Sequence, residues 1–178
     1  MTLSIANLER VLRYGSLIRQ GLVVTVLLSA VTVFFGFILA FALAMMLLSD
    51  VRPFRALAKI KTDNVDRKSR LEFLSRFNPV KTLAGIYVQF VRCTPMLVQI
   101  FLVYYVVFGF ISLPKFTFLG FIQFERFFPG AVALALNSGG YMSDVIRGGI
   151  EGVDHGQTEA ARSLGMSKRQ TMFHIVIP

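Results

Sequence analysis

The sequence is poor in cysteine, histidine and charge. Its 178 residues include a single cysteine, Cys93, so an internal disulfide cannot form. With only two histidines, His155 and His174, the chain also lacks the ligands of a structural zinc site. Charged residues make up 16% of the chain, against about 25% in a soluble globular domain, and 54% of the residues are hydrophobic. The composition excludes disulfide and zinc scaffolds and favours a chain that lies in lipid.

Sequence patterns of enzymes and nucleotide-binding proteins are also missing. No glycine is followed by lysine, so the chain lacks the Gly-x4-Gly-Lys-Ser/Thr phosphate loop. It has no Ser-His-Asp order, no paired buried carboxylates and no metal-ligating cluster. The hydrophobic runs carry no carboxylate deep within them, which disfavours proton-coupled transport. We therefore expect a chain that is not an enzyme and that holds no cofactor of its own.

Three uncharged runs have lengths typical of membrane spans. Residues 21–49 form the longest, with 29 residues or about 43 Å as a helix, against about 30 Å of hydrocarbon. Residues 93–114 form the second, and residues 127–143, interrupted by polar and glycine residues, form the third. A secretory signal is the alternative for the first run, but its apolar part would be only about 7–15 residues. The runs predict an all-α integral membrane protein with about three transmembrane helices.

Lysine and arginine are distributed unevenly between the polar segments. Residues 50–82 hold nine and residues 144–178 hold four, whereas residues 1–20 hold three and residues 115–126 hold two. Because cytoplasmic loops are enriched in these residues, we predict the N-terminus outside and the two richer segments inside. The net charge of +9 alone would also fit a nucleic acid or an anionic lipid. The enrichment of lysine and arginine in the predicted cytoplasmic segments accounts for this net charge. No basic motif with interleaved aromatics supports nucleic-acid binding.

We divide the chain into a leading segment and one transmembrane domain. Residues 1–20 place Ile5, Leu8 and Leu12 at helical spacing, as in an interfacial helix. Residues 21–178 form the transmembrane domain, with cytoplasmic segments at 50–82 and 151–178. The segment 50–82 is predicted to be a solvated linker, with a surface helix around residues 67–77 as the alternative.

Polar side chains at membrane depth fall on two of the predicted spans. The second span has one helical stripe that holds Gln89, Arg92, Met96 and Gln99. Beside this stripe, Pro95 is expected to kink the helix or free a carbonyl. Because buried polar groups in lipid cost free energy unless partnered, the stripe should not face lipid.

The third run carries a second polar face. Asn137, Tyr141 and Asp144 recur at helical spacing, and Gly140 and Gly148 would allow close helix approach. Two interpretations remain open: these groups hydrogen-bond between helices and hold a bundle together, or they face a transported solute. Under the second interpretation, the candidate pathway residues are Gln99, Asn137 and Tyr141.

Residues 154–178 carry start and stop signals for two short helices. Asp154 with Gln157 has the spacing of a capping box, and Gly165 suits a left-handed residue at a helix end. Ser167 with Gln170 repeats the start signal. The segment predicts a helix of about ten residues, a glycine corner and a second helix running toward residue 178.

Small side chains mark the first of these helices. Ala160 shares a face with Leu164, and Ala161 shares one with Gly165, so another surface could approach the backbone closely. Glu159 lies in the first turn, where the helix dipole favours a carboxylate. An ordinary amphipathic surface helix is the alternative interpretation.

The segment resembles the EAA signature of bacterial ABC-importer permease subunits, which reads Glu-Ala-Ala-x3-Gly-x9-Ile-x-Leu-Pro. The matching residues are Glu159, Ala160, Ala161, Gly165, Ile175, Ile177 and Pro178, with isoleucine in the usual leucine position. Two further stretches resemble the permeases for polar amino acids (His/Glu/Gln/Arg/opine). They are residues 92–99, Arg-Cys-Thr-Pro-Met-Leu-Val-Gln, and residues 137–150, which begin Asn-Ser-Gly-Gly-Tyr.

This resemblance implies a type I ABC-importer permease fold, passing several times through a bacterial inner membrane. Such a subunit pairs with a like or identical second permease subunit, two ABC ATPase subunits that bind ATP and Mg, and an extracytoplasmic solute-binding protein. In these importers the EAA helix lies in a groove of the ATPase. The coupling residues that carry over are Glu159, Ala160, Ala161 and Gly165.

The sequence departs from the family pattern in several places. Cys93 replaces a usual glycine, Asp144 replaces a usual glutamate, and the segment 50–82 is longer than is typical. The sequence ends at Pro178, whereas relatives continue through further spans, so we expect a truncated permease. A membrane-anchored remnant or assembly factor that binds an ATPase without transporting is the alternative. A membrane subunit outside the ABC family is a third.

Overall fold

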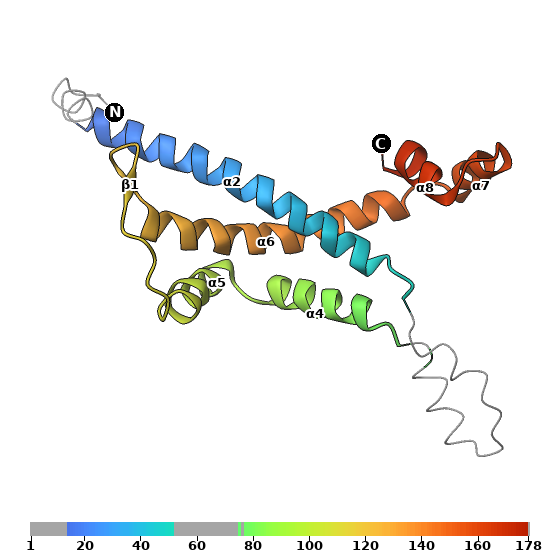
Figure 1. The fold of residues 1–178 in the computed structure, drawn as a ribbon, viewed down its shortest axis with the longest axis horizontal. Coiled ribbons are helices and arrows are strands. Elements are labelled where there is room, and N and C mark those ends of the chain that lie inside the picture. The colour runs from blue at the N-terminus through green and yellow to red at the C-terminus, as the bar shows by residue number, and fades with distance from the viewer. Residues whose placement is uncertain (1–13, 52–74, 76, 178) are drawn as a thin grey trace, which may run out of the picture. The chain divides into compact units, whose positions relative to one another are not determined.

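A computed structural model describes residues 14–51, 75 and 77–177, which form helices and one small β-hairpin (Figure 1). In chain order the elements are α2 (Gly15–Leu47), α4 (Pro79–Cys93), α5 (Met96–Phe101), the π-helix η2 (Leu102–Val107), β1 (Thr117–Phe118), β2 (Ile122–Gln123), α6 (Phe124–Glu151), α7 (His155–Ser163), α8 (Lys168–Thr171) and the π-helix η3 (Met172–Val176).

The chain divides into two compact units. The first contains residues 1–38 and 94–138, and the second contains residues 39–93 and 139–178. The long helices α2 and α6 therefore each contribute residues to both units.

Helix α2 is the first predicted span. Its 33 residues extend about 50 Å, and within the described residues it alone is long and apolar enough to cross a membrane as a single helix. The helix begins at Gly15, so residues 15–20 continue into the span rather than forming a separate interfacial segment. The rest of that predicted segment, residues 1–13, lies outside the described residues.

The second predicted span is broken between Cys93 and Met96. Pro95 precedes α5 with an extended backbone (φ −60°, ψ 137°), because proline cannot donate a helical N–H and its ring crowds the preceding turn. Taken together as one bent span, α4 and the α5–η2 pair form a second candidate for crossing a membrane. The prediction of one continuous stripe is wrong, because the break divides its members between α4 and α5: Gln89, Arg92, Met96 and Gln99.

Helix α6 contains the third predicted run. The helix has 28 residues, of which the uncharged stretch 127–143 makes up about 25 Å. Seventeen residues are near the lower limit for a membrane-spanning helix. Among the described residues, only α2 and the bent pair of α4 with α5–η2 are candidates for crossing a membrane, so the structure supports two of the three predicted spans.

The second unit has an apolar core between α2 and α4. Leu43 and Leu47 of α2 pack against Ala84 and Val88 of α4, and all four side chains are buried. Because lipid tails are as apolar as leucine, such a core within a membrane is held by close van der Waals packing rather than by transfer out of water.

Asn78 determines where α4 begins. Its Oδ1 accepts a hydrogen bond from the backbone N–H of Lys81 at 3.0 Å, and its Nδ2 donates to the carbonyl of Ser49 at 2.6 Å. Pro79 then occupies the first helical position, where no N–H is needed. The helix thus begins inside the segment predicted as the loop 50–82. The alternative surface helix at 67–77 falls almost entirely outside the described residues.

Aromatic rings surround the hairpin in the first unit. Phe116 stacks on Phe124 with ring centroids 4.6 Å apart, and Phe124 stacks on Phe128 at 5.2 Å. Strands β1 and β2 pair antiparallel, with Phe118 opposite Ile122. The rings fix the hairpin to the start of α6.

Candidate functional site

The C-terminal hairpin is built from α7, α8 and η3, which pack against one another. Asp154 caps α7, because its Oδ1 accepts a hydrogen bond from the N–H of Gly156 at 2.6 Å. The N–H of Gln157 bonds to the Asp154 carbonyl instead, at 3.0 Å. The predicted helix start is therefore confirmed, whereas the reciprocal side-chain bond expected from Gln157 does not occur among the described contacts.

Gly165 ends α7 in the left-handed conformation, with φ +85°. Its N–H bonds to the carbonyl of Arg162 at 3.0 Å, and the N–H of Met166 bonds to the carbonyl of Ala161 at 3.1 Å. This pair of bonds is a Schellman motif. A Cβ built at Gly165 would have no atom within 4 Å, so the backbone conformation, and not lack of space, favours glycine here. The predicted glycine corner is confirmed.

The second helix begins with a complete capping box. The N–H of Gln170 donates to Ser167 Oγ at 3.3 Å, and the Ser167 N–H donates to Gln170 Oε1 at 2.8 Å. Because both bonds are local, they hold the corner between α7 and α8 in one conformation. The prediction for Ser167 and Gln170 is confirmed.

The four residues predicted to couple to an ATPase do not share one surface of the hairpin. Ala161 is only 4% exposed, whereas Glu159, Ala160 and Gly165 are exposed. Because α7 packs against α8 and η3, the small side chain of Ala161 serves packing inside the hairpin. From the sequence, Leu164 is identified only as a residue that shares a face with Ala160. Its side chain, at the C-terminal end of α7, is 85% exposed.

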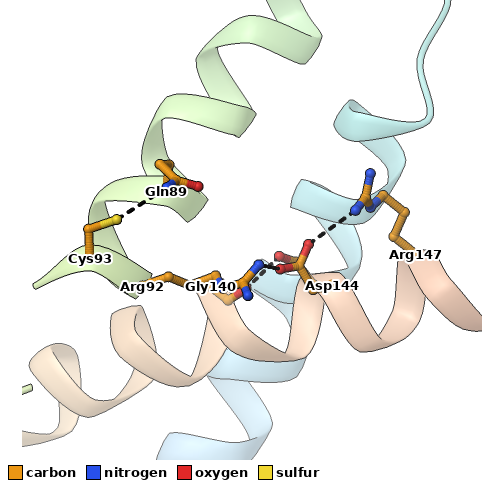
Figure 2. Close-up of polar contacts among 7 residues, drawn as sticks. Gln89, Arg92, Cys93, Gly140, Asp144 and Arg147 are labelled. Carbon is orange, nitrogen blue, oxygen red and sulfur yellow. Dashed lines mark hydrogen bonds and ion pairs between the residues drawn. The ribbon is translucent and has the colours of Figure 1, made fainter.

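An ion cluster joins α4 to α6 in the second unit (Figure 2). Arg92 Nη1 lies 2.6 Å from Asp144 Oδ2, and Arg147 Nη2 lies 3.6 Å from the other carboxylate oxygen. The side chains of Arg92 and Asp144 are 53% and 25% exposed. One carboxylate thus faces two guanidinium groups, which gives the cluster a net positive charge. Asp144 and Arg147 are i,i+3 neighbours on α6, whereas the spacing within each helix gave no sign that Arg92 and Asp144 would meet.

Glycine permits α6 to approach α4 beside this cluster. A Cβ on Gly140 would lie 2.7 Å from Cγ1 of Val91, closer than side chains tolerate. The predicted close approach is therefore confirmed at Gly140. At Gly148 no described atom lies within 4 Å of a Cβ position, so the same prediction is wrong there.

A second polar cluster lies at the helix break in the first unit. Buried Gln99 donates from Nε2 to Oγ1 of Thr94 at 2.7 Å and to its carbonyl at 3.1 Å. Asn137 Nδ2 donates to Gln99 Oε1 at 3.0 Å. Gln99 thus binds the carbonyl of Thr94, the residue that precedes the proline at the helix break. Of the three predicted pathway residues, Gln99 and Asn137 contact each other, and Tyr141 is an exposed residue of the second unit.

Replacing Gln99 by methionine tests this cluster. The variant has nearly the same shape but loses the bonds to Thr94 and Asn137, so we expect a stability loss of about 1–3 kcal/mol. The measurement is thermal unfolding in detergent. The matched control is Gln89→Met, because exposed Gln89 bonds only to Cys93 Sγ in the described contacts and should change little. Equal melting temperatures for the two variants would contradict a holding role for Gln99.

Known proteins provide a comparison for this combination of features. Residues 71–178 match the family described as binding-protein-dependent transport system inner membrane component. The probable amino-acid ABC transporter permease protein y4tG of Sinorhizobium fredii is 41% identical over 95 residues, which are 53% of this chain and 37% of that protein. The nopaline transport system permease protein NocM of Agrobacterium fabrum is 44% identical over 105 residues, covering 59% of this chain and 44% of that protein.

Longer matches extend over most of the chain. The putative glutamine transport system permease protein GlnP of Rickettsia bellii is 33% identical over 159 residues, which are 89% of this chain and 57% of that protein. One solved structure is described as the crystal structure of an amino acid ABC transporter with histidines. The match covers the whole of this chain and 65% of the chain in that structure, with a TM-score of 0.67 and 30% sequence identity. The chain spans between 37% and 57% of the length of these curated relatives.

The fold and the comparisons define an all-α integral membrane protein with an ABC permease fold. Within that class, the chain belongs to the family of inner membrane components of binding-protein-dependent transport systems. Members of this family are membrane subunits of ABC transporters rather than enzymes, and their location is the inner membrane.

Proposed function

We propose that the chain is a permease subunit of an ATP-driven importer for polar amino acids. The C-terminal hairpin carries the proposal, because it holds the EAA residues on a helix that Asp154 caps and that Gly165 ends. The relatives add support, since their names refer to amino-acid, nopaline and glutamine transport. The ATP and Mg would be held by partner ATPase subunits, and this chain would supply no nucleotide chemistry.

The C-terminal hairpin would move as a rigid body. Leu164, Glu159 and Ala160 face outward and would enter a groove of the ATPase, while Asp154, Gly165 and Ser167 hold the backbone. Closure of the ATPase dimer would move the hairpin, and the movement would pass to α6, which ends only three residues before Asp154. The Arg92–Asp144 ion pair would carry it on to α4. The C-terminal hairpin contributes to coupling only through contacts that differ between the two states of the transporter.

The remaining partners follow from this role. A second permease subunit would complete the pathway, and a solute-binding protein would deliver the amino acid from the outer side. The hairpin and the segment 50–82 would then face the cytoplasm, with the N-terminus outside. Gln99, Asn137 and Tyr141 remain our candidates for contact with the solute, with Gln99 and Asn137 also holding the helix break.

Uptake in proteoliposomes tests the proposal. The chain is reconstituted with its second permease subunit, its ATPase and its binding protein, and ATP-dependent uptake of glutamine, arginine and histidine is compared with uptake of leucine. We expect uptake of at least one polar amino acid and little uptake of leucine. ATPase binding without any uptake would favour the assembly-factor alternative. Absence of both would contradict the proposal.

The exposed leucine of α7 gives a more local test. Leu164→Asp places a charge where an apolar contact with the ATPase is proposed, and loss of that contact should cost about 1.5 kcal/mol or more. We expect affinity for the ATPase, measured in detergent, to fall about tenfold or further. Leu164→Met keeps the apolar volume and serves as the matched control. Unchanged affinity of the aspartate variant would exclude Leu164 from the interface.

A further inference from the structure

The connection between η2 and α6 exposes apolar side chains where a polar turn would be expected. Residues 116–124 contain no charged side chain, and Leu119 and Gly120 form the tip of the hairpin. The Leu119 side chain is 63% exposed, and Phe110, just after η2, is 90% exposed. Both residues lie in the first unit.

Leu119 combines a strained backbone, which costs the same in water and in lipid, with an exposed apolar side chain, which is unfavourable only in water. Its φ of +52° is in the left-handed region, which costs a residue with a Cβ about 1–2 kcal/mol and normally favours glycine or asparagine. Its apolar side chain is also exposed at the tip of a turn. The position therefore fits an apolar environment around the tip better than water.

The hairpin presents this tip on a defined frame. Thr117 pairs with Gln123 and Phe118 with Ile122, and the N–H of Phe124 bonds to the carbonyl of Phe116 at 3.1 Å. Phe118 also contacts Phe127 of α6 edge to face, with ring centroids 5.4 Å apart. These contacts hold the exposed apolar tip in a fixed orientation relative to the start of α6.

Exposed cationic side chains flank the uncharged stretch on both sides, with half-buried Glu125 between its last residue and Arg126. Lys115 precedes it, Arg126 follows it, and both side chains are exposed. An apolar segment flanked by exposed lysine and arginine is the arrangement of interfacial membrane segments, whose cations reach the lipid phosphates.

We propose that the hairpin 116–124 inserts into the boundary between headgroups and acyl chains of the bilayer, with Leu119 and Phe110 in contact with lipid. Lys115 and Arg126 then lie at the level of the phosphates. Lipid is the occupant because only eight residues, 108–115, separate the hairpin from the membrane segment α5–η2 and because the exposed cations Lys115 and Arg126 complement anionic headgroups. The inference depends on the membrane location of the chain and not on the amino acid that it carries.

The absence of tryptophan from the chain allows a direct test. A single tryptophan is introduced as Leu119→Trp, and the full chain is reconstituted in vesicles of phosphatidylcholine and phosphatidylglycerol. We expect blue-shifted emission and about twofold quenching by lipids brominated near the headgroup end of the acyl chains, since interfacial segments lie about 5–10 Å deep. Iodide in the buffer should quench weakly. A second reporter, Phe121→Trp, exchanges one aromatic residue for another outside the left-handed positions and covers the case in which Leu119→Trp does not fold.

Two control variants calibrate the measurement. Val26→Trp, exposed on α2, should report the bilayer interior, and Leu164→Trp, exposed on α7, should report water. Iodide quenching of both hairpin reporters equal to that of Leu164→Trp would overturn the proposal. Blue-shifted emission without quenching by brominated lipid would also overturn it, because it would place the tip against protein.

Discussion

Replacing Gly165 by valine is expected to reduce ATP-driven uptake about tenfold or more while the membrane spans remain folded. The glycine has φ +85°, a conformation that costs a residue with a Cβ about 1–2 kcal/mol and is especially unfavourable for a β-branched side chain. The backbone would leave the left-handed conformation, and the Schellman bonds from Gly165 and Met166 would be lost. Because about 1.4 kcal/mol corresponds to a tenfold change in population, the C-terminal hairpin of α7, α8 and η3 would seldom hold its docking conformation.

The measurement for this variant is uptake together with ATPase activity in proteoliposomes. Gly149→Ala is the matched control, because a Cβ at Gly149 also meets no atom within 4 Å and its φ is an ordinary one. We expect the control to transport normally, and the valine variant to hydrolyse ATP without matching uptake. Normal uptake by the valine variant would contradict the coupling role of the glycine corner.

Replacing Gly140 by leucine is expected to destabilise the second unit by about 3 kcal/mol. A Cβ at this position would lie 2.7 Å from Cγ1 and 3.0 Å from Cβ of Val91, so α6 would have to move away from α4. That movement would also separate Arg92 from Asp144, whose charges now lie 2.6 Å apart. Loss of this pair adds about 1 kcal/mol or less, because the Arg92 side chain is 53% exposed and Asp144 keeps Arg147 as a partner.

Thermal unfolding in detergent measures this effect. On the same helix, Gly149→Leu has open space around its Cβ and should be neutral or stabilising by up to about 1 kcal/mol through helix propensity. Adding Val91→Ala to Gly140→Leu should recover part of the loss, because the two side chains compete for the same space. If the two leucine variants melt alike, the close contact between α4 and α6 is not what holds this unit.

Features that depend on neighbours along the chain could be predicted from the sequence. The positive φ of Gly165, the capping box of Ser167 and Gln170 and the helix break at Pro95 all follow from local backbone chemistry. Proline lacks an N–H, glycine accepts a left-handed backbone, and serine with glutamine three residues later satisfies two backbone groups. The first span was equally accessible, because length and hydropathy alone define it.

Features that depend on how helices meet could not be predicted in the same way. Gly140 and Gly148 have the same chemistry, and yet only Gly140 lies against a neighbouring side chain, Val91. Arg92 and Asp144 are 52 residues apart, and nothing in either helix identifies the other as its partner. The burial of Ala161 likewise depends on α8 and η3 folding back on α7. Such contacts need the three-dimensional arrangement.

The central claim, that the hairpin 154–177 faces the cytoplasm and contacts an ATPase, has one direct test. With Cys93→Ser removing the only native cysteine, Leu164→Cys places a single thiol at the exposed end of α7. We predict a cross-link to an ABC ATPase subunit by a reagent that joins the thiol of Leu164→Cys to a lysine of the ATPase, and labelling by an impermeant maleimide in inside-out but not right-side-out vesicles. Lys115 lies in a segment that is predicted to be outside, so Lys115→Cys should be labelled in right-side-out but not in inside-out vesicles. Labelling of Leu164→Cys only from the outside, or no cross-link in the assembled transporter, would contradict the account.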